Sequence, residues 1–164
     1  MAVRPIITLP NDAAVLRAVA KKVKRIDGSI HSLVEDLIDS MRAAGGVGLA
    51  APQIGVSLKV IVLGIPGVEP LALINPEIVK RSGGRRMMEG CLSVPGYRGE
   101  VIRSQRVTAK ALGLDGRAVR IRAEDDLLAQ ALEHEINHVN GIVYIDQVRN
   151  PDRFLLLRDL EAEE

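Results

Sequence analysis

The chain has 164 residues, of which 22 are Lys or Arg and 21 are Asp or Glu, so its formal net charge is +1. This near-neutral balance argues against nucleic-acid or membrane binding driven by bulk charge. Two tyrosines, one phenylalanine and no tryptophan argue against base stacking on aromatic side chains. We therefore expect one globular domain over residues 1–164, with no direct nucleic-acid site and no membrane contact.

Basic side chains cluster in the middle of the chain, and we interpret them as a solvated face: Lys80, Arg81, Arg85, Arg86, Arg98, Arg103 and Arg106. The N-terminal segment MAVRPIITLPND lacks the apolar core and the small-residue cleavage site of a secretory signal. No run approaches the roughly 20 apolar residues of a membrane-spanning helix. Since a lone cysteine cannot form an internal disulfide, we expect a cytoplasmic protein.

The first third of the chain predicts two helices: one capped by Asn11 or Asp12 and ending near Val23, and one capped by Ser29 and ended by Gly45 and Gly46. The glycine-rich segment 46–55 is expected to lack regular structure. A strand is expected over residues 58–65. A second strand over 71–80 is expected to be interrupted at Pro76, because proline cannot donate to a β-ladder.

Residues 107–123 alternate apolar and polar side chains on both sides of Asp115-Gly116, which is typical of a β-hairpin. The helical period returns over about 124–140 and is expected to end at Gly141, and a short helix over about 152–161 closes the chain. The residues around Cys91 fit neither a helical nor a strand pattern. Strands that precede a long helix indicate an α+β fold, with antiparallel β-sheets packed around that helix.

The long helix carries His134-Glu135-x-x-His138. At 100° per residue the two histidines lie about 40° apart on one helical face, so both imidazoles can reach one cation. Glu135 projects beside them and can contact a water without binding the metal, as the general base of zinc hydrolases does. Two of the three histidines of the chain share this spacing, so the sequence predicts a catalytic metal site. The third histidine, His31, is expected to be exposed and uninvolved.

A metal site needs a third protein ligand, and the protease patterns do not supply one. Tyr144 occupies the position of the final histidine in the pattern HExxHxxGxxH, and a tyrosinate is a poor ligand at neutral pH because its reference pKa is about 10. The downstream glutamates fall in the polar terminus. What remains is Cys91, whose thiolate with two imidazoles would leave a fourth position open. The alternative for Cys91 is a buried, inert thiol.

Three segments together resemble the peptide deformylase family, whose motifs are GφGφAAPQ, EGCφS and HExDH, with φ apolar. This chain has Gly46-Val47-Gly48-Leu49-Ala50-Ala51-Pro52-Gln53, then Glu89-Gly90-Cys91-Leu92-Ser93, then His134-Glu135-Ile136-Asn137-His138. The order and spacing match, and the similarity runs over nearly the whole chain. The resemblance implies the deformylase fold and a hydrolase that removes the N-formyl group from the terminal formylmethionine of new polypeptides.

The resemblance also implies a role for each site residue. Cys91, His134 and His138 would hold the metal, usually Fe(II), with Zn(II), Ni(II) or Co(II) as substitutes. Glu135 would accept a proton from the attacking water and pass it to the departing amine. The Gln53 amide and the Leu92 backbone N–H would donate to the formyl oxygen. Substrate binding would fall to Val47, Gly48, Glu89 and Gly90.

Two departures from the family pattern stand out. Asn137 replaces the usual aspartate, so we expect activity to survive with altered metal affinity or stability. The chain ends in acidic RDLEAEE, whereas some members carry a basic C-terminal helix that docks on the ribosome, so that contact is not expected to use such a helix. The alternatives are a catalytically silent, deformylase-like binding protein, supported only by Asn137, and a zinc peptidase, which lacks a third ligand.

Overall fold

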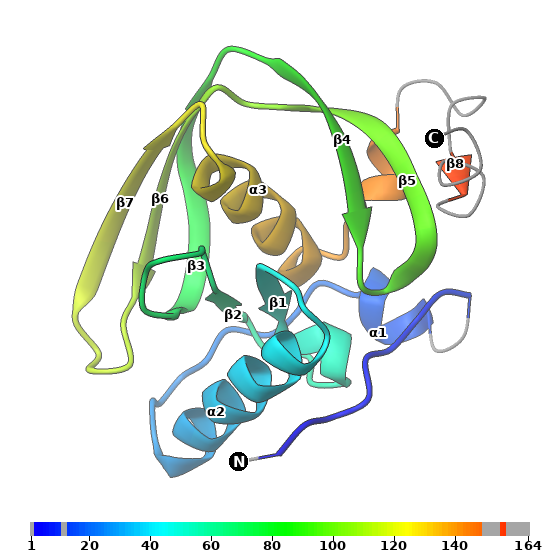
Figure 1. Ribbon diagram of the computed structural model, residues 1–164. Coiled ribbons are helices and arrows are strands. Elements are labelled where there is room, and N and C mark those ends of the chain that lie inside the picture. Colours follow the sequence, from blue (N-terminus) through cyan, green and yellow to red (C-terminus); the bar gives the residue numbers. More distant parts are fainter. Residues whose placement is uncertain (1, 11–12, 149–154, 157–164) are drawn as a thin grey trace.

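The structure is a computed structural model that describes residues 2–10, 13–148 and 155–156. Its helices are α1 (Ala13–Arg17), α2 (Gly28–Ala43) and α3 (Leu127–Val139), with short 3-10 turns at η1 (Ala51–Ile54) and η2 (Tyr144–Gln147). Figure 1 shows α3 at the centre, with strands on either side of it and α2 below. Within the described residues, no helix is long and apolar enough to cross a membrane.

The strands form two antiparallel sheets. The five-stranded sheet has the order β1 (Gly48–Ala50), β2 (Val60–Leu63), β3 (Leu71–Ser82), β6 (Arg106–Leu112) and β7 (Ala118–Glu124). The three-stranded sheet has the order β4 (Arg85–Cys91), β5 (Val94–Arg103) and β8 (Leu155–Leu156). Because the sheets are antiparallel and enclose α3 (Figure 1), the predicted α+β class is confirmed.

The main core lies between the five-stranded sheet and one side of α3. Alternate residues of β6, among them Val107 and Ala109, point inward and pack against Leu132 and Ile136 of the helix. A second core packs α2 against the neighbouring faces of β1 and β2, through side chains such as Leu37 and Val62. Both cores are almost wholly aliphatic, as the scarcity of aromatic residues requires. The first core fixes α3 against the five-stranded sheet, and the second fixes α2 against β1 and β2.

Several predicted elements form where they were expected. Gly116 adopts a φ of 79° in the β6–β7 turn, and Gly141, with a φ of 77°, follows the end of α3. Helix α2 also ends just before Gly45, but its N-cap is Asp27, whose carboxylate accepts from the Ser29 N–H at 3.0 Å. The Ser29 cap was therefore wrong by two residues: Asp27 has the extended backbone of an N-cap, and Ser29 lies inside the first turn, where its hydroxyl donates to the Asp27 carboxylate.

Other expectations were wrong. The first helix stops at Arg17, since Ala20 and Lys21 instead bond to the backbones of Val139 and Ser57; its predicted caps, residues 11 and 12, lie outside the described residues. Strand β3 continues through Pro76, where a register shift between Ile74 and Glu77 accommodates the proline. The glycine-rich segment 46–55 forms β1 and η1.

The sequence predicted no regular structure around Cys91, and here the structure differs most. Residues 85–103 form the long β4–β5 hairpin, with Cys91 as the last residue of β4. Its charged and glycine residues hid the strand pattern. The expected final helix over 152–161 falls mostly outside the described residues, and its two described residues, Leu155 and Leu156, pair instead with Arg98 and Tyr97 of β5.

Candidate metal centre and active site

Helix α3 carries both histidines of the HExxH motif. It begins at Asp126, whose carboxylate accepts from the backbone N–H of Ala129 at 2.8 Å. Apolar side chains surround most of its circumference, so the helix is buried and its polar residues face protein rather than bulk water. His138 is fully buried, and its Nε2 lies 3.2 Å from the Nε2 of His134. The two imidazoles therefore face one point.

Cys91 meets the same point from the opposite sheet. It ends β4, and the two-residue turn Leu92-Ser93 leads directly into β5. The Cys91 Sγ atom lies 3.2 Å from the Nε2 of His138, and the Ser93 N–H approaches the sulfur at 3.4 Å. One donor atom from each of Cys91, His134 and His138 lies within 4.8 Å of the others. The structure thus brings together the three residues expected to bind metal.

The donor atoms fit a tetrahedral metal ion. Metal bonds of about 2.0 Å to nitrogen and 2.3 Å to sulfur place neighbouring ligand atoms about 3.3–3.6 Å apart. The two separations of 3.2 Å around His138 Nε2 are close to that spacing. The lone pairs of the two imidazole nitrogens and the thiol sulfur converge in a buried site and repel one another. A bound cation or a shared proton is needed to offset that repulsion. The set matches Zn(II) or Fe(II), and three ligands leave a fourth position open.

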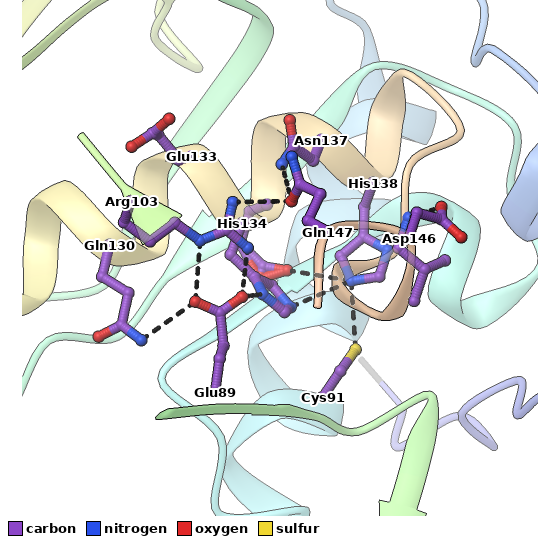
Figure 2. A network of polar contacts seen from close by, with 12 residues as sticks. Glu89, Cys91, Arg103, Gln130, Glu133, His134, Asn137, His138, Asp146 and Gln147 are labelled. Carbon is purple, nitrogen blue, oxygen red and sulfur yellow. Dashed lines mark hydrogen bonds and ion pairs between the residues drawn. The ribbon is translucent and has the colours of Figure 1, made fainter. Parts of the chain in front are cut away.

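Glu89 orients His134. Its carboxylate is 5% exposed and accepts from the Nδ1 of His134, which leaves the Nε2 lone pair directed at the site (Figure 2). The same carboxylate receives two bonds from Arg103, one of them from Nε at 2.9 Å, and one from Gln130 at 3.1 Å. Burial alone would raise the pKa of Glu89, but the hydrogen bonds from Arg103 and His134 lower that pKa to about 2. Glu89 therefore stays ionised.

Glu89 also lines a hollow beside Cys91 and His134, so its expected role in substrate binding stays a prediction. The position of Arg103 was predicted wrongly. It was assigned to a solvated basic face, yet it is 1% exposed. A buried carboxylate needs a buried cation beside it, and Arg103 is that cation. Its partner lies on the neighbouring strand, 14 positions away in sequence.

Glu135 is the buried acid beside the two histidines. Its side chain is 4% exposed, and its Oε1 has no hydrogen-bond partner among the described residues. Burial raises the pKa of Glu135 to about 7, while the neighbouring His134 opposes the rise. The carboxylate packs against Gly48, where an added Cβ would lie 2.8 Å from Oε2 and 2.9 Å from Cγ. The absence of a side chain at Gly48 makes room for Glu135; Gly48 also lines the hollow, and its expected contact with substrate stays a prediction.

The remaining expected residues surround one hollow of about 570 Å³. Gln53 is buried, its Oε1 accepts from the Ala50 N–H at 2.9 Å, and its Nε2 lies 3.1 Å from Ser93 Oγ and 3.6 Å from Cys91 Sγ. Leu92 occupies the turn beside the sulfur. Val47, which is 38% exposed, and Gly90 line the mouth. The hollow is thus bounded by all three motifs of the sequence.

Comparison with known proteins places this arrangement in a family. The model of the polypeptide deformylase family matches residues 3–154. The chain belongs to the peptide deformylase family. It is 52% identical to a peptide deformylase of Dehalococcoides mccartyi over 93% of this chain and 90% of the relative. A peptide deformylase of Thermomicrobium roseum is 48% identical, with 99% of this chain and 96% of the relative covered.

Solved structures of the family show the same fold. The crystal structure of a peptide deformylase from Legionella pneumophila superposes with a TM-score of 0.85 at 41% identity, over 99% of both chains. A peptide deformylase from Synechococcus elongatus, solved in complex with actinonin, gives a TM-score of 0.86 at 35% identity, over 99% of this chain and 87% of that one. The deformylase-like fold expected from the motifs is therefore confirmed.

Tyr144, which stands where some zinc proteases have a third histidine, does not join the donor cluster. Its ring stacks near His134, with centroids 6.2 Å apart, and its hydroxyl donates to the Tyr97 carbonyl at 3.3 Å. Burial raises the pKa of Tyr144 well above its usual value. The hydroxyl therefore stays protonated, which agrees with the exclusion of the protease pattern.

Sequence reasoning did not single out three polar residues near the centre: Arg103, Gln130 and Gln147. Gln130 lies one helical turn before His134, a spacing that places both side chains on one face of α3. That spacing was a usable signal. Gln147 accepts from Arg103 and from Asn137, each at 3.2 Å. It carried no local signal, because it follows α3 on a separate turn.

Proposed function

We propose that this chain removes the N-formyl group from formylmethionyl peptides by metal-dependent hydrolysis, with Glu135 as the general base. Membership of the peptide deformylase family supports the reaction. The observation that carries the assignment of residues is the convergence of Cys91, His134 and His138 within 4.8 Å, beside the buried Glu135 carboxylate. We place the reaction in the cytoplasm, where new polypeptides are made.

Cys91, His134 and His138 would hold the ion, which we propose to be Fe(II), with Zn(II), Ni(II) or Co(II) able to replace it. An ion bound there supplies a Lewis acid that polarises the formyl carbonyl and makes water more acidic. Glu135 takes a proton from the attacking water as the water oxygen bonds to the formyl carbon. It then delivers that proton to the amine nitrogen as the carbon–nitrogen bond breaks. The products are formate and a peptide with a free amino group.

Gln53 and Leu92 are placed to stabilise the formyl oxygen as it gains charge. The Gln53 amide is held by the Ala50 N–H at its oxygen, which leaves its Nε2 directed towards Cys91. A fixed donor of this kind stabilises a developing oxyanion without reorganising. We assign the second donor to the backbone N–H of Leu92. Val47 and Gly90, at the mouth of the hollow, would contact the peptide that follows the formyl group.

One experiment tests this function against its alternatives. Anaerobically purified, Fe(II)-loaded protein is assayed for formate release from formyl-Met-Ala and for cleavage of an unblocked peptide of the same sequence. We expect formate release and no cleavage of the unblocked peptide. Metal binding without either reaction would favour the silent binding protein, and cleavage of the unblocked peptide would favour a peptidase. Replacing Glu135 by Gln should abolish turnover while leaving the metal content unchanged.

A further inference from the structure

Asn137 and Gln147 close a ring of polar contacts on the His134 side of the proposed metal site. The ring runs from His134 on α3 to Glu89 on β4, from Glu89 to Arg103 on β5, and from Arg103 to Gln147 in η2. Gln147 then returns to α3, where the Nδ2 of Asn137 donates to its Oε1 at 3.2 Å. Figure 2 shows all five side chains. The ring begins and ends on the same helix, three residues apart.

The Oε1 atom of Gln147, like each carboxylate oxygen of Glu89, receives two donors from different elements. The Gln147 Oε1 lies 3.2 Å from Arg103 Nη1 and 3.2 Å from Asn137 Nδ2. Both partners are donors at those atoms, since a guanidinium has no acceptor and an amide nitrogen donates. The opposite amide orientation would place the NH₂ of Gln147 against two donors. The contacts therefore fix which end of the Gln147 amide faces inward.

In this ring Asn137 acts as a hydrogen-bond donor, which an ionised aspartate cannot do. An aspartate at position 137 would present only acceptor oxygens to the acceptor Oε1 of Gln147. The amide of Asn137 supplies the proton that this contact needs. Asparagine in place of the usual aspartate at position 137 is thus complementary to its partner, the acceptor oxygen of Gln147.

We propose that Gln147 and Asn137 are positioning residues of the metal centre, which act on His134 through Arg103 and Glu89. Gln147 does not line the hollow, so it has no direct route to substrate. Arg103 already gives two bonds to Glu89, and the contact with Gln147 fixes its third nitrogen. A guanidinium held at all three nitrogens fixes the Glu89 carboxylate, and the carboxylate fixes the ring plane of His134. This inference rests on the proposed metal dependence.

The decisive measurement is the rate at which a chelator removes Co(II) from the loaded protein, followed by the visible absorption of the cobalt site. Loss of a residue that orients a metal ligand typically weakens metal binding about 10- to 100-fold. Because Gln147 acts two residues further out, we expect Gln147→Leu to release Co(II) about 3- to 10-fold faster. Gln147→Glu keeps an acceptor for both donors, so it should release the metal at the wild-type rate. Activity at saturating metal should stay within about twofold of wild type in both variants, with KM unchanged.

Two further variants separate positioning from general loosening of the helix. Asn137→Leu should match Gln147→Leu, and the double variant should be no worse than either, because both break the same ring. Asn140→Ala is the matched control, since it removes a side-chain bond to the Ile136 carbonyl at the end of α3 without touching the ring. We expect it to retain Co(II) like wild type.

Three results would overturn the proposal: wild-type release from Gln147→Leu, equally fast release from Gln147→Glu, or equally fast release from Asn140→Ala. Failure of the proposed function is a separate outcome. In that case the wild-type protein itself would bind no Co(II) or release no formate.

Discussion

The contact between Gly48 and Glu135 gives the sharpest test of the site. A Cβ at position 48 would lie 2.8 Å from Oε2, 2.9 Å from Cγ and 3.1 Å from Cδ of Glu135. Ordinary contacts of this kind lie at about 3.5 Å, so in Gly48→Ala the carboxylate must retreat by about 0.5 Å. It is buried and cannot swing into solvent. Misplacement of a reacting group by 1 Å can cost about 100-fold in rate.

We therefore expect Gly48→Ala to lower kcat about 10- to 100-fold while metal content is unchanged. The assay is formate release from formyl-Met-Ala by the Fe(II)-loaded enzyme, with metal content measured on the same sample. Gly46→Ala is the control within the same motif, because its Cβ would meet the flexible end of Leu92 at 2.8 Å instead of Glu135. It should cost less than about threefold. Equal losses in the two variants, or a loss of metal in Gly48→Ala, would refute the reasoning.

Three further outcomes follow from other contacts. Arg103→Met leaves the Glu89 carboxylate buried without its cation, so we expect a loss of about 3 kcal/mol in unfolding free energy, measured by urea denaturation. Burial tends to raise the pKa of Asp36, but hydrogen bonds from the Ala2 N–H and Arg4 hold it below its usual value. Asp36→Asn should therefore cost about 1 kcal/mol at neutral pH. Because the folded carboxyl has the lower pKa, the deficit should shrink as the pH falls through about 3.9 and below; an unchanged deficit at pH 3 would contradict this. Air exposure should oxidise Cys91, with added oxygen mass on its peptide and loss of metal in parallel.

Helices and strands that depend on local sequence patterns could be predicted from the sequence. The β6–β7 hairpin depends on alternation around Asp115-Gly116, and α3 depends on helical spacing and a terminal glycine. The cluster of two histidines follows from their separation on one helix. The approach of Cys91 could be inferred by elimination and from the family resemblance, but not from a local pattern, because β4 reaches α3 through tertiary packing.

The surroundings of the metal ligands could not be predicted in the same way. Arg103 is surrounded in sequence by exposed basic residues, and only its pairing with Glu89 across two strands explains its burial. Gly48 is one of several glycines in its motif. Its lack of a side chain is required by the Glu135 carboxylate, which is distant in sequence. The decisive neighbour lies on the paired strand β4 for Arg103 and on helix α3 for Gly48, and neither is adjacent in sequence.

The proposed ligands of the metal come from both layers of the molecule: Cys91 ends a strand of the three-stranded sheet, and the histidines belong to the helix packed on the five-stranded sheet. A bound ion would therefore fasten the β4–β5 hairpin to α3, so the stability of the fold should depend on free metal concentration. At 100 times the dissociation constant this linkage amounts to about 2.7 kcal/mol. Withdrawal of the ion would free the hairpin first, and its amides should then exchange with solvent faster than those of β6 and β7.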